Sequence, residues 1–146
     1  MKVLFVCHGN ICRSPMAEFI FKDMVQKEGL ASVFSVIESR AVSYEEIGNP
    51  VYPPARAELA RHGISCDGHS AKRITISDGH DFDLILAMDH SNLRLLSHIL
   101  DKRGMDKVRT LLDRDIADPW YTGDFKITYN DVVEGCRLLI DEFRNN

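Results

Sequence analysis

The sequence predicts an α/β protein: one domain over residues 1–146, with helices covering both faces of a parallel sheet. Short apolar runs rich in β-branched residues alternate with longer segments in which apolar residues recur at helical spacing. This alternation implies right-handed βαβ units and a three-layer α/β/α arrangement. The length of 146 residues suits a single core, and neither a repeat nor a linker-like tract divides the chain.

Four strands and four longer helices account for the pattern. Strands are expected at residues 2–6, 33–38, 83–88 and 108–112, and helices at 15–29, 53–63, 90–99 and 127–143. Ser14 is expected to cap the first helix and Asp89 the third, because both side chains accept hydrogen bonds from the unpaired N–H groups of a helix start. Residues 113–126 are expected to form a loop.

The bulk composition favours a cytoplasmic protein. A net charge of -4 argues against broad binding to nucleic acid or anionic membranes. The apolar runs fall short of the roughly 18 residues that a transmembrane helix needs, and residues 2–6 are too short for a secretory signal. In a reducing compartment the four cysteines, Cys7, Cys12, Cys66 and Cys136, are expected to be mostly free thiols.

The stretch after the first expected strand carries the chemistry. Cys7 ends the strand, and Gly9, Asn10, Arg13 and Ser14 follow before the first helix. Ligands of parallel α/β sheets bind at the carboxyl ends of the strands. The N–H groups of such a loop, the positive end of the helix dipole and the Arg13 guanidinium form a site for a phosphate group. The same field favours the thiolate of Cys7, a nucleophile toward a bound phosphate ester.

Two other interpretations of these cysteines stay open at this point. A cysteine at the end of an apolar strand is most often a small core residue. Cys7 and Cys12 together also suggest a metal site, although their spacing is not the usual zinc pattern and a second Cys/His pair does not follow closely.

A candidate proton donor lies in the expected loop before the last helix. Asp118-Pro119-Trp120-Tyr121 combines a carboxyl group with a stiff proline and two aromatic residues. Trp120 and Tyr121 would wall a cleft for an aromatic ring and partly desolvate Asp118, which favours the protonated acid. The alternative is a plain Asp-Pro turn whose aromatic side chains pack on the core.

The residues from Cys7 to Pro15 resemble the phosphate-binding loop of the low-molecular-weight protein tyrosine phosphatases. Asp118 to Tyr121 resembles the general-acid motif of that family. Residues 47–50, 62–64 and 86–93 fit the family pattern in order, so the resemblance covers essentially the whole chain. It implies a four-stranded parallel sheet of strand order 2-1-3-4, with the phosphatase loop after the first strand.

The resemblance also implies a role for each site residue. Cys7 would form a phosphocysteine intermediate, Arg13 would bind the phosphate oxygens and Asp118 would act as general acid and base. The phosphate-binding loop would comprise Cys7, Arg13 and the further residues His8, Gly9, Asn10, Ile11, Cys12 and Ser14. Ser14 would hydrogen-bond the Cys7 sulfur, and Ser39 and His69 would support Asn10.

The resemblance implies further properties of the site. Cys12 would form a reversible disulfide with Cys7 under oxidation. The reaction would need neither a metal ion nor a cofactor. The substrate would be a phosphotyrosine protein or a small aryl phosphate, and the protein a monomer or weak dimer.

Two positions depart from the family pattern. His8 stands where many members carry an aliphatic residue, and an imidazole at the mouth of the site would touch substrate or act on Cys7. In Ser43-Tyr44-Glu45-Glu46, Tyr44 is expected to form a wall of the cleft in place of an aromatic residue at position 45. The two glutamates would favour substrates with basic neighbours.

Four rival functions remain at this stage. Protein arginine phosphatases of the same family carry Thr where Ile11 stands, and the extra methyl group would crowd the guanidinium of phosphoarginine. Arsenate reductases use further cysteines after the third strand, and residues 80–100 contain none. A cysteine phosphocarrier needs neither Arg13 nor Asp118, and a catalytically silent phosphate-binding module needs no nucleophile.

Overall fold

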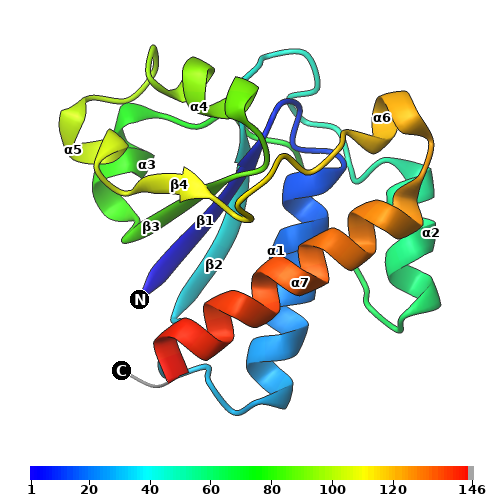
Figure 1. Cartoon of the computed structure of the whole chain (residues 1–146). Helices are drawn as coiled ribbons and strands as arrows, with labels where there is room; N and C mark the ends of the chain where they lie inside the picture. Colours follow the sequence, from blue (N-terminus) through cyan, green and yellow to red (C-terminus); the bar gives the residue numbers. More distant parts are fainter. Residues whose placement is uncertain (145–146) are drawn as a thin grey trace.

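Four parallel strands form one sheet in the computed structural model, which describes residues 1–144 (Figure 1). The strands are β1 (Lys2–Cys7), β2 (Val36–Ala41), β3 (Leu84–Ala87) and β4 (Val108–Thr110). Their order is β2-β1-β3-β4, and every pairing is parallel. The predicted parallel sheet of order 2-1-3-4 is therefore confirmed.

The central strand β1 places the first cysteine at the carboxyl edge of the sheet. Residues 3–7 of β1 are buried, which explains why this run is apolar on both faces. Cys7 pairs with Ala41 of β2, and Val6 pairs with Ala87 of β3. The loops that follow β1, β2 and β3 consequently start beside one another.

Helices cover both faces of the sheet (Figure 1). The helices α1 (Arg13–Lys27), α2 (Pro53–Arg61) and α7 (Phe125–Arg144) pack with Val3 and Phe5 of β1. The elements α3 (Ile76–Asp81), α4 (His90–Leu96) and α5 (Lys102–Met105) lie on the opposite face, where Leu4 and Val6 of β1 contribute to a second core cluster. Alternate side chains of β1 thus pack into two separate core clusters, one on each face of the sheet, as the predicted three-layer arrangement requires.

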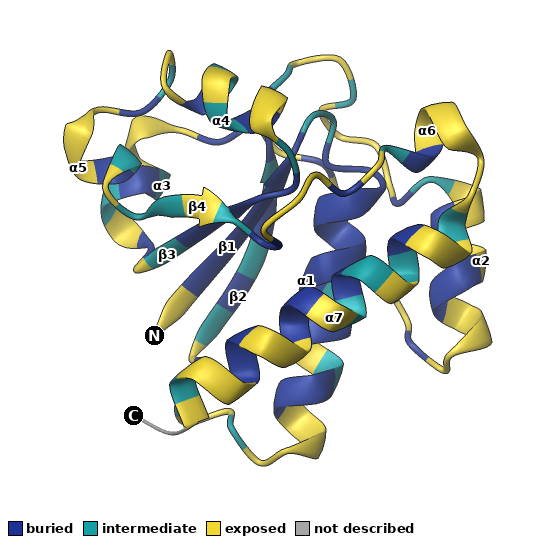
Figure 2. Cartoon of the chain, in the orientation of Figure 1, coloured by how far each residue is buried: buried dark blue, intermediate teal, exposed yellow. Residues whose placement is uncertain are grey.

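The buried residues line the inner faces of these helices, and their exposed residues face solvent (Figure 2). The single turn α6 (Pro119–Thr122) lies at the carboxyl edge of the sheet, before α7. Within residues 1–144, each helix is too short or too polar to cross a lipid bilayer.

Several element boundaries differ from the sequence predictions. The second strand begins at Val36 rather than at residue 33, because residues 33 and 34 turn back to Leu30 through backbone hydrogen bonds. Phe34 then packs edge-on against Phe21, with ring centroids 4.9 Å apart. The short helices α3, α5 and α6 were not predicted, because one turn of helix has too few residues to show a periodic apolar pattern.

The predicted helix caps had different outcomes. Asp89 caps α4 as expected, since its carboxylate accepts from Asn92 N at 2.8 Å. The prediction for Ser14 was wrong: α1 begins two residues earlier than expected, at Arg13, with Cys12 at the N-cap position. Ser14 lies inside the first turn, and its hydroxyl group contacts the phosphate-binding loop instead.

Candidate active site

The loop between β1 and α1 curls around the sulfur of Cys7. Asn10 N donates to Cys7 Sγ at 3.3 Å, and Ser14 Oγ lies 3.0 Å from the same sulfur. Asn10 has a φ of 61°, the left-handed region that asparagine tolerates better than most residues. The Asn10 N–H and the Ser14 hydroxyl group therefore both reach the sulfur, and hydrogen-bond donors placed in this way can hold an anionic group at this point.

Asn10 is the centre of the contacts that hold this loop. Its side-chain amide donates to Ser14 Oγ at 2.8 Å and to Ser39 Oγ at 2.9 Å, while Oδ1 accepts from Lys72 N at 3.1 Å. His69 Nε2 lies 2.8 Å from the Asn10 carbonyl oxygen. The structure thus brings Ser39 and His69 onto the residue that they were expected to support.

A buried carboxylate, not anticipated from the sequence, extends this network. Ser39 Oγ donates to Glu18 Oε1 at 2.6 Å, and Lys22 Nζ pairs with Glu18 Oε2 at 2.6 Å. Glu18 is buried because it follows Ser14 by one helical turn on the inner face of α1. The spacing of four residues between Ser14 and Glu18 was the signal in the sequence from which this contact could have been predicted.

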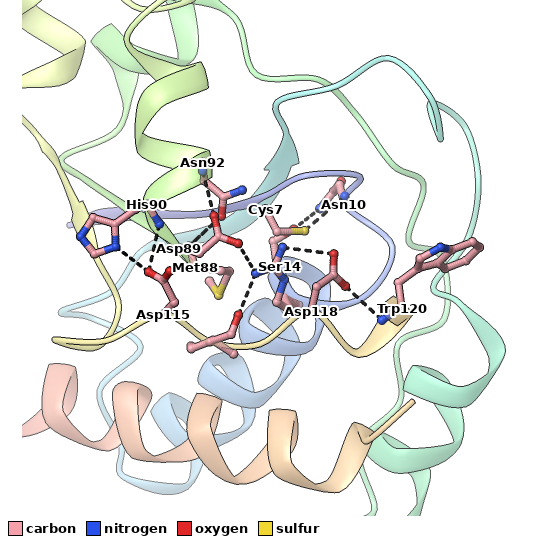
Figure 3. A network of polar contacts seen from close by, with 12 residues as sticks. Cys7, Asn10, Ser14, Met88, Asp89, His90, Asn92, Asp115, Asp118 and Trp120 are labelled. Atoms are coloured by element: carbon pink, nitrogen blue, oxygen red, sulfur yellow. Dashed lines mark hydrogen bonds and ion pairs between the residues drawn. The ribbon is translucent and has the colours of Figure 1, made fainter. Parts of the chain in front are cut away.

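Arg13 is held by three acceptors that come from distant parts of the chain, of which Asp89 and Asp118 are labelled in Figure 3. Its NH1 donates to Asp89 Oδ2 at 2.6 Å and to the Ile116 carbonyl oxygen at 2.8 Å, while NH2 lies 3.4 Å from Asp118 Oδ2. Burial disfavours the charge, but Cys7, Asp89 and Asp118 outweigh it and raise the pKa of Arg13. The guanidinium is therefore a permanent cation beside Cys7.

Asp118 closes the other side of the same pocket. It caps α6, with Oδ1 accepting from Trp120 N at 3.0 Å. The Trp120 ring lies against Tyr52, with centroids 4.8 Å apart. The pocket is lined by Cys7, His8, Gly9, Ile11, Cys12, Arg13, Glu45, Glu46, Asp118, Trp120 and Tyr121.

The rim of the pocket differs from expectation at position 44. The Tyr44 ring packs on the Arg73 guanidinium, with Arg73 Cζ 4.1 Å from the ring centroid. Tyr44 is not among the residues that line the pocket. Glu45 and Glu46 line the pocket in its place, and His8 Nε2 lies 3.4 Å from Glu45 Oε1. The rim therefore combines an imidazole with two carboxylates.

The cysteines of the chain are all reduced in this structure. Cys12 lines the pocket near Cys7, and burial, together with the charges of Cys7 and Asp118, raises the pKa of its thiol. Cys12 is therefore protonated at neutral pH. Within residues 1–144, His, Cys, Asp and Glu side chains do not gather in a group of three or more that could hold a metal ion.

The comparison with known families agrees with this geometry. A family model described as low molecular weight phosphotyrosine protein phosphatase matches residues 2–146. The low molecular weight protein-tyrosine-phosphatase YfkJ of Bacillus subtilis is 39% identical over 147 residues, covering 96% of this chain and 94% of that protein. The human low molecular weight phosphotyrosine protein phosphatase is also 39% identical, over 150 residues, with the same coverage.

Solved structures show the same fold. The crystal structure of YfkJ superposes with a TM-score of 0.93 at 37% identity, covering 99% of this chain and 95% of that one. A Drosophila arginine phosphatase superposes with a TM-score of 0.89 at 33% identity, covering 98% of both chains. The fold, the near-complete coverage and the family match lead to one assignment: the chain belongs to the low molecular weight phosphotyrosine protein phosphatases, a family of hydrolases.

Proposed function

We propose that this protein is a phosphotyrosine phosphatase that works through a phosphocysteine intermediate and an aspartate acid/base. One observation carries the proposal: Cys7, Arg13 and Asp118 line the same pocket, and the buried Arg13 guanidinium donates a hydrogen bond to Asp118. A nucleophile, a phosphate-binding cation and a proton donor are the three parts that such a reaction needs. Trp120 and Tyr121 supply apolar walls for an aromatic ring.

The first step transfers the phosphoryl group to sulfur. The loop N–H groups and the Arg13 fork bind the phosphate oxygens, and the Cys7 thiolate attacks phosphorus opposite the ester oxygen. The S–P bond forms while the P–O bond to the tyrosine breaks, and Asp118 protonates the departing phenoxide.

The second step returns the enzyme to its starting state. Asp118, now a carboxylate, takes a proton from a water molecule that attacks the phosphocysteine. The P–O bond to water forms, the S–P bond breaks and Cys7 leaves as a thiolate. Ser14 Oγ, 3.0 Å from the sulfur, stabilises that leaving thiolate by donating a hydrogen bond.

The test is turnover of p-nitrophenyl phosphate and of a phosphotyrosine peptide. Cys7→Ser is expected to be inactive, because a serine hydroxyl is a far weaker nucleophile and leaving group. Asp118→Ala is expected to lose about 10²–10⁴-fold in kcat/KM with poor leaving groups. Rapid quenching followed by intact-mass measurement should detect a phosphoryl group on Cys7. Retained activity in Cys7→Ser would contradict the mechanism. The absence of a phosphoryl group on Cys7 during turnover would contradict it as well.

Phosphoarginine is the second candidate substrate, favoured by the similarity to a Drosophila arginine phosphatase. Ile11 lines the pocket, so its side chain bears directly on the choice. A methyl group more than threonine leaves less room for a guanidinium and more apolar surface for a phenyl ring. We expect Ile11→Thr to raise the ratio of phosphoarginine to phosphotyrosine hydrolysis. An identical ratio in the wild type and in Ile11→Thr would show that Ile11 does not determine the choice between the two substrates.

The proposal extends to the setting of the reaction. Reduced cysteines suit the cytoplasm, where we place the protein as a monomer or weak dimer acting on phosphotyrosine proteins or small aryl phosphates. Catalytic release of inorganic phosphate separates this enzyme from a phosphocarrier, which would stop at one phosphoryl group per chain, and from a silent phosphate-binding module.

A further inference from the structure

Two residues outside the pocket join the first turn of α4 to the loop that carries Asp118. Asp115 Oδ1 accepts from the backbone N of His90 at 3.0 Å and lies 2.6 Å from His90 Nδ1 (Figure 3). The imidazole holds the pKa of the Asp115 carboxyl below its usual range through this hydrogen bond. Neither residue lines the pocket, so their contact cannot act on substrate directly.

The next residue along the loop is also anchored. Ile116 N donates to the Met88 carbonyl oxygen at 2.9 Å, and the Ile116 carbonyl oxygen accepts from Arg13 at 2.8 Å. On the far side of Asp118, Trp120 packs on Tyr52. Asp118 therefore lies between two anchored residues, Ile116 and Trp120. A single residue separates it from each of them in the chain.

We propose that His90 and Asp115 form a positioning pair that sets where Asp118 stands for proton transfer. The pair fixes the loop three residues before the acid, and a proton donor must lie within hydrogen-bond distance of the leaving oxygen to act. The start of α4 would then serve both phosphate binding and proton transfer. Asp89 holds the phosphate-binding Arg13, and His90 holds the segment that leads to the acid Asp118. The inference rests on the proposed role of Asp118.

The experiment compares two substrates in variants of this pair. Phenyl phosphate has a poor leaving group and depends on the acid, whereas p-nitrophenyl phosphate depends on it much less. Asp115→Ala removes both hydrogen bonds and is expected to lower kcat/KM for phenyl phosphate about fivefold. A change of this size corresponds to the free energy of one exposed ion pair. The loss for p-nitrophenyl phosphate and the change in the inhibition constant of inorganic phosphate should each stay below about twofold.

Three further variants make the test specific. His90→Ala keeps the backbone donor and should lose less than Asp115→Ala, and His90→Asn, whose amide nitrogen can replace Nδ1, should restore the phenyl phosphate rate. Asp113→Ala is the matched control, because Asp113 lies in the same loop with a 97% exposed side chain. In an Asp118→Ala background, Asp115→Ala should cause no further selective loss, since the residue that it positions is gone.

The outcomes separate this inference from the proposed function. Equal losses on both substrates, a weaker inhibition by phosphate, or an undiminished effect in the Asp118→Ala background would overturn the positioning role while leaving the phosphatase intact. If Asp118→Ala itself shows no preference for the poor leaving group, the acid assignment and this inference fall together. Both His90 and Asp115 side chains are more than half exposed, so the variants are expected to fold.

Discussion

Ser14 Oγ lies 3.0 Å from Cys7 Sγ and accepts a 2.8 Å hydrogen bond from the side-chain amide of Asn10. Because Asn10 already donates to this oxygen, the hydroxyl hydrogen of Ser14 is left for the sulfur or for the Arg40 carbonyl oxygen at 3.4 Å. The shorter contact is to sulfur. Ser14 is therefore placed to donate to a Cys7 thiolate rather than to cap α1.

Ser14→Ala should weaken both the nucleophile and the leaving group. A hydrogen bond to a charged group contributes about 1.5–3 kcal/mol, so we expect about a tenfold or larger loss in kcat with p-nitrophenyl phosphate. Alkylation of Cys7 by iodoacetate at neutral pH should slow as well. Ser97→Ala, which removes an exposed hydroxyl group outside the pocket, is the control. An unchanged alkylation rate would show that this hydroxyl does not stabilise the thiolate.

Two substitutions of Asn10 separate its side chain from its backbone. Asn10→Gly loses the amide hydrogen bonds but accepts the φ of 61°, whereas Asn10→Ala loses the hydrogen bonds and strains the backbone. Urea unfolding should show both variants destabilised, with Asn10→Ala less stable than Asn10→Gly by about 1–2 kcal/mol. Equal stabilities would mean that the loop relaxes to a negative φ once the amide is removed.

Gly135 lets α7 approach the end of β4 closely. A Cβ atom at this position would lie 2.4 Å from Leu111 Cγ, far inside van der Waals contact. We expect Gly135→Ala to destabilise the fold by about 1–3 kcal/mol through overpacking, seen as a lower Tm. In a Leu111→Ala background the same change should cost much less. A full cost in that background would point to another contact.

Glu58 makes the stability of the α2 region depend on pH. Its side chain is only 5% exposed, and hydrogen bonds from Arg61 and His62 lower its pKa from the usual 4.5. A lowered pKa in the folded state stabilises the protein above pH 4.5, and this contribution disappears as the pH falls through the folded-state pKa.

Glu58→Gln should therefore be less stable than the wild type by about 1–3 kcal/mol near neutral pH, and the difference should shrink in acid. Denaturant unfolding from about pH 7 to about pH 3 would measure it. Glu142→Gln, which breaks an exposed pair with Arg109, is the control and should change stability little. A difference that does not vary with pH would rule out the ionised carboxylate as its cause.

Local sequence determined much of the site. The apolar run 3–6, the glycine and asparagine after Cys7, and the arginine before a helix are neighbours in the chain, so their chemistry is visible without a fold. The same holds for Asp118 with its proline and aromatic residues. Alternation of strand and helix patterns was sufficient for the parallel sheet, because that alternation allows few other arrangements.

Local reasoning misjudged residues that have a choice of partner. Ser14 has the side chain of a helix cap, but the tight loop brings Cys7 and Asn10 within reach of its hydroxyl group. Tyr44 has the side chain of a cleft wall, but Arg73 offers its ring a cation to pack on. In both cases a tertiary contact competes with the local preference, and only the folded chain decides between them.

The sequence by itself determined the kind of chemistry: a strand-end thiol, a phosphate-binding cation and a distant carboxyl group. Only the tertiary structure decided which groups hold them, since Asp89 reaches Arg13 across 76 residues and Asp115 reaches His90 across 25. Parallel strands in the order β2-β1-β3-β4 bring the end of β3 beside the end of β1. Contacts between such remote segments depend on chain crossing and strand register, which leave no periodic or local mark in the residues themselves.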